Sequence, residues 1–369
     1  MKGKSVTIAE VARAAGVSTA TAGRVLGGYG YSSAQKRSAV LEAAEALGYR
    51  PNLLARSLIT GHTRTLGVVA GDIESPFYAA ILRGIANVAE TQSFGLLITN
   101  SDENVARELR AVELLQEKQV DGLIVSPCDT IGAAHLREAA ARVPVVLIDR
   151  EVEALEVDSV GADNIAGAQD CVAGLLAAGH RRIGFVAELE TSPLGGLGPF
   201  LDAAGQGEVS ARGLYPSWQR LLGYIRAHQA AGVPLERGLV RRVGQYSVAA
   251  AEREAAAMID GPGRPSAVFT GDGLMSSAAM AAVRAAGLAI PRDLSMVGFD
   301  DLDWMAFVGP GIDAVAQPRR AMGETAARML LERVAGLNAP PRRVRLATRR
   351  MRRGSIGPPP GRAGDAEAS

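Results

Sequence analysis

Acidic side chains stand directly after several predicted strands of this 369-residue chain. An acid in that position often caps the following helix, and capping remains the alternative for several of them. Five such ends on parallel strands would nevertheless converge at the sheet edge where ligands of open α/β sheets bind. Carboxylates accept hydrogen bonds from hydroxyl groups and arginine donates in a fork, so the set suits a polyhydroxylated ligand. The five ends are Asp72, Asp149-Arg150, Asp163-Asn164, Gly271-Asp272 and Asp300-Asp301.

A second kind of chemistry is indicated at the N-terminus, where TIAEVARAAGVSTATAGRVLG (7–27) predicts two short helices. Thr7 and Glu10 have the spacing of a capping box for the first helix. Gly16 ends that helix in a left-handed turn, and Ser18 caps the second. Two helices this short are unstable alone but can share a small core, as in a helix-turn-helix.

The exposed side of the second helix carries small side chains at Thr19, Ala20 and Thr21. Small side chains would let the helix backbone approach the floor of the major groove. Arg24 could then reach a phosphate or a guanine edge. An ordinary helical hairpin at the head of a larger domain is the alternative.

The charge distribution favours the DNA interpretation. Residues 1–64 contain nine basic and three acidic side chains, a formal charge of +6, whereas the whole chain is +1. The remaining residues therefore carry −5. A basic segment on an acidic body is typical of a protein that binds the phosphate backbone.

A third helix is predicted from Ser33 to Gly48, and a very short apolar helix, Leu53–Leu58, follows the cap residue Asn52. The short helix needs a partner to be stable. It could pair with its twin from a second subunit in the minor groove, with Leu58 wedged between base pairs. A linker helix packed on the main body is the alternative.

From Leu66 onward strands alternate with helices such as 78–92 and 106–118, which predicts an α/β fold with two parallel sheets. Right-handed crossovers would place helices on both faces of each sheet. The expected strands are 66–70, 95–99, 122–125, 145–148 and 159–161, then 183–186, 240–243, 267–270 and 295–298.

Three compositionally biased stretches complete the chain. The Gly-, Pro- and Ser-rich segment 189–217 predicts a mobile surface loop, and its glycine run lacks the Lys-Ser/Thr of a phosphate-binding loop. The basic segment 342–353 could suggest nucleic acid, but its alternation favours an edge strand. The tail 357–369 is predicted to be disordered.

Composition excludes several classes of protein. We find no window of 18 or more apolar residues and no signal peptide, so we expect a cytoplasmic protein without membrane spans. Two cysteines form no disulfide framework and four scattered histidines have no ligand spacing, so neither a metal nor a cofactor is expected. G-x-S-x-G and an ordered Ser/His/Asp set are both missing, so no catalytic residue is assigned and we expect a protein that is not an enzyme.

Over residues 7–356 the chain resembles the LacI/GalR family of bacterial transcription regulators. The resemblance is carried by TIAEVARAAGVSTATAGRVL, EAAEALGYRPNLLARSL, TLGVVAGDIESPFYAAILRGI, VDGLIVSP, GHRRIGFVA, VFTGDGLMSSAAMAAVRAAGLAIPRDLSMVGFDD and AVAQPRRAMGETAARMLL. It implies a DNA-binding headpiece (1–50), a linker with a hinge helix (51–62), and an effector-binding and dimerisation domain (63–356) like periplasmic sugar-binding proteins. The implied lobes of that domain are about 66–163 with 318–344, and about 164–316 with 345–356.

The resemblance also implies the site residues. The expected DNA-binding residues are Thr7, Ser18, Thr19, Ala20, Thr21, Arg24, Asn52, Ala55 and Leu58. The expected effector-binding residues are Phe77, Asp149, Arg150, Arg220, Tyr246, Asp272 and Asp300. Phe77 and Tyr246 would offer apolar faces to a sugar ring.

This sequence departs from the family pattern at three places. Ala22-Gly23 replaces the usual Val-Ser, and Gly23 should weaken the recognition helix by ~1 kcal/mol. Gly27 stands where Asn is common. Gly271 replaces a frequent Asn, which removes one hydroxyl partner.

The favoured interpretation is an allosteric repressor, a homodimer or tetramer, on a pseudo-palindromic operator and controlled by a sugar or sugar derivative between the lobes. A cytoplasmic solute-binding protein with a vestigial DNA-binding head is the alternative. The basic N-terminal segment argues against it.

Overall fold

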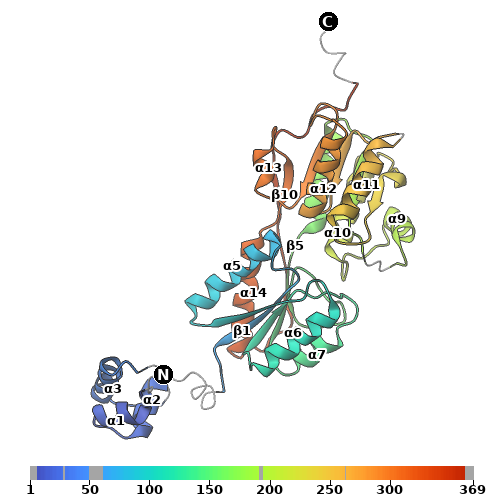
Figure 1. Cartoon of the computed structure of the whole chain (residues 1–369). Coiled ribbons are helices and arrows are strands. Elements are labelled where there is room, and N and C mark those ends of the chain that lie inside the picture. Colours follow the sequence, from blue (N-terminus) through green and yellow to red (C-terminus); the bar gives the residue numbers. More distant parts are fainter. Residues whose placement is uncertain (1–5, 28–29, 50–60, 191–193, 262, 362–369) are drawn as a thin grey trace. The chain divides into compact units, whose positions relative to one another are not determined.

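The computed structural model describes residues 6–27, 30–49, 61–190, 194–261 and 263–361. The chain forms two compact units (Figure 1), a small one of Met1–Thr65 with Gln119–Asp121 and a large one containing the rest. The expected hinge helix, with Asn52, Ala55 and Leu58, lies outside the described residues.

The small unit contains α1 (Ile8–Ala14), α2 (Thr19–Gly27) and α3 (Ala34–Ala46). The predicted capping box is confirmed, because the Thr7 backbone N–H donates to Glu10 at 2.7 Å and Thr7 Oγ1 accepts from the Glu10 N–H at 3.4 Å. Gly16 adopts a φ of +63°, as a left-handed turn requires. Ser18 Oγ accepts from the Thr21 N–H at 3.2 Å and so caps α2.

The apolar faces of these three helices pack together into one small core. It contains Val11, Ala12, Ala22, Val25, Val40 and Ala44. On α3, Leu41 and Leu47 stay outside this core and are 49% and 40% exposed. Three short helices bury too few positions to cover every apolar side chain of α3.

The large unit has two lobes, each built on a six-stranded sheet, and both sheets follow the same plan. Lobe 1 has the strand order β11-β5-β4-β3-β1-β2, and lobe 2 has β12-β10-β9-β8-β6-β7. The edge strand β12 runs antiparallel to β10, whereas β6, β7, β8, β9 and β10 pair in parallel. The strands of lobe 1 are β1 (Thr65–Ala70), β2 (Gly95–Asn100), β3 (Gly122–Val125), β4 (Val145–Ile148), β5 (Asp158–Ala162) and β11 (Arg343–Leu346). Those of lobe 2 are β6 (Ile183–Ala187), β7 (Val240–Arg242), β8 (Ala267–Thr270), β9 (Ser295–Phe299), β10 (Asp313–Ala316) and β12 (Arg349–Met351).

Helices cover both faces of the lobe 1 sheet. The pair α5 and α14 packs on the face whose strand residues include Leu66, Val68 and Val146, while α6 and α7 lie beside β2 and β4 (Figure 1). Ser75 caps α5, so the first turn of that helix begins just beyond the end of β1. The helices of lobe 1 are α5 (Pro76–Thr91), α6 (Val105–Glu117), α7 (Ala134–Ala140) and α14 (Arg319–Val334).

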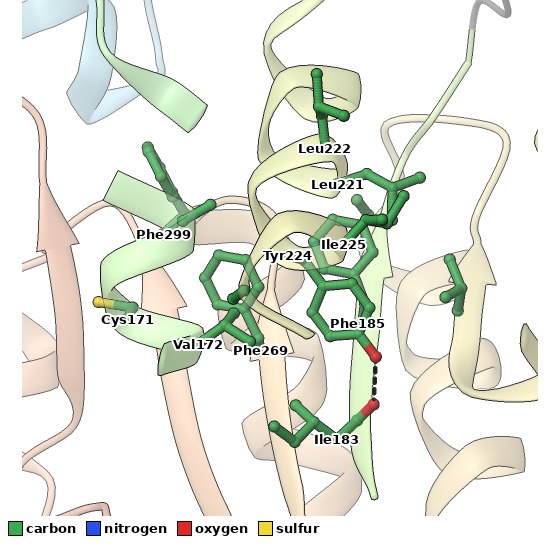
Figure 2. Close-up of a cluster of buried hydrophobic side chains, with 14 of the residues drawn as sticks. Cys171, Val172, Ile183, Phe185, Leu221, Leu222, Tyr224, Ile225, Phe269 and Phe299 are labelled. Carbon is green, nitrogen blue, oxygen red and sulfur yellow. Dashed lines mark hydrogen bonds between the residues drawn. The ribbon is translucent and has the colours of Figure 1, made fainter. Parts of the chain in front are cut away.

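Lobe 2 buries an aromatic core between its sheet and the helices α8 and α10. The Phe185 ring centroid lies 5.4 Å from that of Tyr224 and 5.5 Å from that of Phe269. Figure 2 shows these rings together, with the buried Tyr224 hydroxyl donating to the Ile183 carbonyl oxygen at 2.7 Å. The helices of lobe 2 are α8 (Asn164–Ala177), α9 (Leu197–Gly205), α10 (Pro216–Ala230), α11 (Val248–Asp260), α12 (Gly273–Ala285) and α13 (Trp304–Phe307), with a 3-10 turn at Arg237–Leu239.

The basic segment 342–353 is a pair of edge strands, one for each sheet. β11 pairs with β5 in lobe 1 and β12 pairs with β10 in lobe 2, which confirms the edge-strand interpretation. The chain therefore passes from lobe 1 to lobe 2 after Leu346. This is two residues later than the boundary at 344/345 that the resemblance implied.

The interpretation of 189–217 as a mobile loop is wrong over the part that the structure describes. Residues Leu197–Gly205 form α9, and Phe200 and Leu214 are buried in the lobe 2 core. The Phe200 ring lies 4.6 Å from Trp218. The glycine and proline content suggested a loop, but the apolar residues 200, 201 and 204 give the helix a face that the core covers.

Replacing Phe200 with alanine should lower the free energy of unfolding of the large unit by about 3–5 kcal/mol, as for other buried aromatic residues. Denaturant unfolding followed by tryptophan fluorescence measures the change, because Trp218 reports on this contact. Phe307→Ala is a matched control, since that ring is 85% exposed. A loss below about 1 kcal/mol would indicate that 197–205 behaves as a surface loop.

The prediction that disorder begins at residue 357 is wrong, because Gly357 is hydrogen-bonded to lobe 2. The Gly357 N–H donates to Ser295 Oγ at 3.0 Å, and its carbonyl oxygen lies 2.9 Å from His180 Nε2. His180 is buried and also contacts Ser266 Oγ at 2.8 Å. These contacts join the end of the described chain to lobe 2. Within the described ranges, no helix is both long and apolar enough to cross a bilayer.

Candidate functional site

Residues from both lobes of the large unit line a cavity of about 380 Å³. Its size lies within the usual range of small-molecule sites, about 300–1,000 Å³. The polar ends of strands β4 and β9 meet there with the first turns of α5, α10 and α12. The structure brings all seven expected effector-site residues to its wall: Phe77, Asp149, Arg150, Arg220, Tyr246, Asp272 and Asp300.

Two of these aspartates occupy equivalent positions in the two lobes. Asp149 follows β4 and Asp300 follows β9, the fourth strand of each half of the chain. Both adopt left-handed backbone conformations, with φ of +69° and +68°. Such conformations are unfavourable for residues other than glycine and tend to occur at functional sites.

Arg150 is already paired within the protein. Both of its terminal nitrogens donate to Glu103, the Nη2–Oε1 distance being 2.8 Å, and Nη1 also donates to the Pro127 carbonyl oxygen at 3.0 Å. Burial alone would raise the pKa of Glu103, but the charge and hydrogen bonds of Arg150 outweigh it and lower that pKa. Arg150 is therefore not an open fork for a ligand, contrary to our interpretation of the strand end.

Glu103 is the centre of a cluster that includes two tyrosines. Its Oε1 accepts from the Tyr78 hydroxyl at 3.2 Å and its Oε2 accepts from the Tyr215 hydroxyl at 3.3 Å. The guanidinium carbon of Arg150 lies 4.2 Å from the centre of the Tyr215 ring. Tyr215 comes from the start of α10 in lobe 2, so this cluster links the two lobes.

Arg220 is held in a fixed direction by lobe 2. Its Nε donates to Asn164 Oδ1 at 2.9 Å, its Nη1 donates to the Gly271 carbonyl oxygen at 2.7 Å, and its guanidinium carbon lies 4.0 Å from the Phe299 ring centre. Gly223 lets α10 approach α8 closely, because a Cβ there would lie 2.4 Å from the Ile165 carbonyl oxygen. This close packing positions Arg220 in the cavity wall.

The presence of glycine at position 271 also has a structural reason. A Cβ at this position would lie 2.5 Å from the Ala187 Cβ, so the strands β6 and β8 leave no room for a side chain. The next residue, Asp272, caps α12 by accepting the Met275 N–H at 2.9 Å and also lines the cavity. Burial, with the nearby charge of Glu188, raises the pKa of Asp272 to about 8.

The five acidic strand ends do not all converge. Asp163 caps α8 through the Ala166 N–H at 3.0 Å and does not line the cavity, so the capping alternative is correct there. Asp301 is also not in the wall, and Arg353 Nη2 lies 2.7 Å from its Oδ1. Asp72, Asp149, Asp272 and Asp300 do line the cavity.

Sequence reasoning missed several residues of the wall. Glu188 directly follows β6 and Glu103 follows β2 by three residues, so the strand-end rule could have found both. Tyr215 carried no such signal because it lay in the supposed loop. Gln317, at a crossing between lobes, donates to Asp300 Oδ1 at 2.6 Å.

In the small unit the expected DNA-binding residues lie on and around α2. Thr7, Ser18, Thr19, Ala20 and Arg24 are exposed, and Thr21 is half-buried. Arg24 lies along its own helix, with Nη2 donating to Thr21 Oγ1 at 3.4 Å. Across the described residues, no group of three His, Cys, Asp or Glu side chains could hold a metal ion.

Three family models match successive parts of the chain. Residues 7–52 match the bacterial regulatory proteins of the lacI family. Residues 63–198 match the periplasmic binding proteins and sugar binding domain of the LacI family, and residues 172–356 match the periplasmic binding protein-like domain.

Similar proteins extend over nearly the whole length. The HTH-type transcriptional regulator PtxS of Pseudomonas plecoglossicida is 34% identical over 353 residues, which cover 95% of each chain. The transcriptional regulator CelR, solved with cellobiose, is 28% identical with a TM-score of 0.65 and covers 95% of this chain and 99% of its own. The lac repressor dimer bound to operator is 23% identical with a TM-score of 0.78, a likeness of fold over 96% of this chain and 100% of that one. The chain belongs to the LacI family of bacterial transcriptional regulators.

Proposed function

We propose that this protein is a cytoplasmic repressor that binds a pseudo-palindromic operator as a dimer and whose DNA affinity is set by a small polyhydroxylated ligand. The ligand binds in the cavity between the lobes. The observation that carries this proposal is the convergence of seven polar and aromatic side chains from both lobes on one cavity of about 380 Å³.

DNA binding is assigned to the exposed side of α2. Thr19 and Ala20 leave that surface shallow, and Arg24 is the basic side chain within reach of a base edge or phosphate. The same unit contains residues 1–64, whose formal charge is +6. Operator binding is also what the lac repressor, a protein of the same fold, is described as doing.

Ligand binding is coupled to DNA binding through lobe closure. The hydroxyl of Tyr215 in lobe 2 donates to Glu103 in lobe 1, and Arg212 of the same segment donates to the Glu153 carbonyl oxygen at 3.4 Å. A ligand beside these contacts would favour one degree of closure over another. Coupling of this kind is typically about 1–3 kcal/mol and acts equally in both directions.

The test is fluorescence anisotropy with a duplex selected from a random pool. Tight binding should weaken steeply with salt, because each phosphate contact releases counterions. A ligand found by thermal shift should then change operator affinity about 5–150-fold. A bound ligand that leaves operator affinity unchanged would disprove the coupling, and the lack of any selected duplex would disprove the function.

Dimerisation is assigned to an apolar patch over β2 and α6 of lobe 1. Leu97 and Ile98 on β2 are 38% and 47% exposed, and Leu109 and Leu114 on α6 are 38% and 45% exposed. β2 is an edge strand, and none of its six residues is buried. An apolar edge of this kind is typical of a surface that pairs with another chain.

Replacing Ile98 with glutamate should weaken the dimer at least about tenfold, because a charge at the centre of an apolar interface is left desolvated. Analytical ultracentrifugation over a concentration series measures the change. Ile131→Glu is the matched control, since Ile131 is 73% exposed and lies outside β2 and α6. If both variants remain dimers at low micromolar concentration, the dimer uses another surface.

A further inference from the structure

The cavity is strongly acidic, which the proposed function does not explain. Among the described residues that line it, eight are acidic and two are basic. Neutral sugars need hydrogen-bond acceptors and donors but no such excess of one charge. The acidic residues are Asp72, Glu74, Glu103, Asp149, Glu188, Glu190, Asp272 and Asp300, and the basic residues are Arg150 and Arg220.

Neither arginine offers a fork of two free donors to an anionic ligand group. Arg150 forms a forked pair with Glu103 and stacks on the Tyr215 ring. Arg220 uses Nε on Asn164 and Nη1 on the Gly271 carbonyl oxygen. A carboxylate or phosphate placed here would meet repulsion from the remaining carboxylates without gaining an arginine fork.

Two buried carboxylate oxygens of the cavity wall lack a hydrogen bond to the described residues. They are Oδ1 of Asp149 and Oε2 of Glu188. Asp149 is 9% exposed and Glu188 is 7% exposed, and both residues line the cavity. A buried acceptor without a partner is costly, so each of these oxygens is an available acceptor for a ligand donor.

The carboxylates also interact with one another. Burial raises the pKa of Asp149 to about 6, with the nearby Asp300 and Glu103 adding to the rise while Arg150 and Arg220 oppose it. Burial and the charge of Glu188 raise the pKa of Asp272 to about 8. Asp272 therefore retains its proton near neutral pH, and a cationic ligand could displace it.

The remaining wall restricts what that cation can be. Aromatic rings of Phe77, Tyr215 and Tyr246 line the same cavity and offer faces to a flat apolar surface, as on a sugar ring. The described residues include no group of three side chains suited to a metal ion, so an organic cation fits better. Rings and acceptors together suit a pyranose that carries an ammonium group.

We propose that the cavity selects an amino sugar, with its ammonium group held by Glu188 and Asp272 and a hydroxyl group donating to Asp149. This inference rests on the proposed function and names the chemical class of its ligand. Neutral sugars of the same skeleton bind more weakly, and sugars with a carboxylate or phosphate are rejected.

The experiment compares probes that differ at one group. The full-length protein at pH 7.5 is titrated calorimetrically with glucosamine, galactosamine and mannosamine, with the parent hexoses, and with glucuronate and glucose 6-phosphate. At least one amino sugar should bind about tenfold or more tightly than its parent hexose, because its ammonium pairs with buried carboxylates. An equal or tighter Kd for a hexose or an anionic sugar, or no binding of any amino sugar at 10 mM (about the weakest useful affinity), would overturn the inference.

The variant Glu188→Gln tests whether Glu188 pairs with the ammonium group of the ligand. Glu188→Gln keeps the shape and removes the charge, so it should weaken the amino sugar about tenfold or more and the parent hexose much less. Glu138→Gln removes the same charge from an exposed position on α7 and should change neither. If Glu188→Gln weakens both sugars equally, Glu188 does not read the ammonium group and the inference fails.

The same titrations are repeated with the selected duplex present, so that two failures can be told apart. A neutral or anionic sugar that changes duplex affinity would leave the proposed function standing and remove the amino-sugar inference. Amino-sugar binding without any selective duplex binding would support the amino-sugar inference and disprove the proposed DNA-binding function.

Discussion

Replacing Glu103 with alanine should lower the free energy of unfolding of the large unit by about 3–5 kcal/mol, the cost of breaking a buried ion pair. Arg150 is 7% exposed and would lose the carboxylate to which it donates hydrogen bonds, keeping only Asp149, whose Oδ2 lies 3.5 Å from its Nε. The hydroxyls of Tyr78 and Tyr215 would lose the same acceptor. Because Tyr215 belongs to lobe 2, the variant should also weaken the coupling between ligand and operator.

Denaturant unfolding and operator titrations with and without ligand measure the two effects. The control is the double variant Glu103→Ala/Arg150→Met, which removes both charges together. Replacing a buried ion pair with apolar groups is often neutral, so the double variant should recover most of the lost stability. A double variant as unstable as Glu103→Ala would mean that the hydrogen bonds of the tyrosines, and not the ion pair, carry the stability.

The recovered stability should not restore coupling. Tyr215 would still lack its acceptor on lobe 1, so the ligand should change operator affinity less than in the unaltered protein. Full coupling in the double variant would place the connection between the lobes elsewhere, for example at Arg212 and Glu153.

The sequence was sufficient to predict the two sheets because buried strands are short apolar runs bounded by turn residues. It also located Asp149, Asp272 and Asp300, since a polar residue after a parallel strand must lie at the ligand-binding edge. The same reasoning failed at Asp163, where local capping of α8 competes with the cavity for the carboxylate. A single sequence does not show which of these two outcomes occurs.

The connection between the lobes could not be predicted because it depends on contacts between distant segments. Arg150 and Tyr215 share the carboxylate of Glu103 but lie 47 and 112 residues from it in the sequence. Composition moreover indicated a loop where α9 and the start of α10 in fact bring Tyr215 to Arg150. The pairing of Arg150 with Glu103 could not be predicted for the same reason, since this partner is identified only by the fold.

The stability of the large unit should fall as pH rises from about 4 to about 8, and Asp272→Asn should remove part of that fall. Burial raises the pKa of Asp272 from an ordinary value of 3.8 to about 8. Between these values the unfolded chain releases the proton while the folded protein retains it, so the free energy of unfolding decreases with pH. Below the lower value both states are protonated and this contribution to stability is complete.

Asparagine can still cap α12 through the Met275 N–H, so the substitution changes charge more than structure. At pH 8.5 the variant should be more stable than the unaltered protein by at least about 1.4 kcal/mol, the equivalent of one pKa unit. That difference corresponds to a rise in Tm of about 2–4 °C for a domain of this size. Thermal unfolding at intervals from pH 4.5 to 8.5 measures the curve.

Asp163→Asn is the matched control, because Asp163 caps α8 in the same way outside the cavity and should leave the pH dependence unchanged. If Asp272→Asn and the unaltered protein lose stability in parallel across this range, the retained protons lie on another carboxyl group, and Asp149 is the next to substitute.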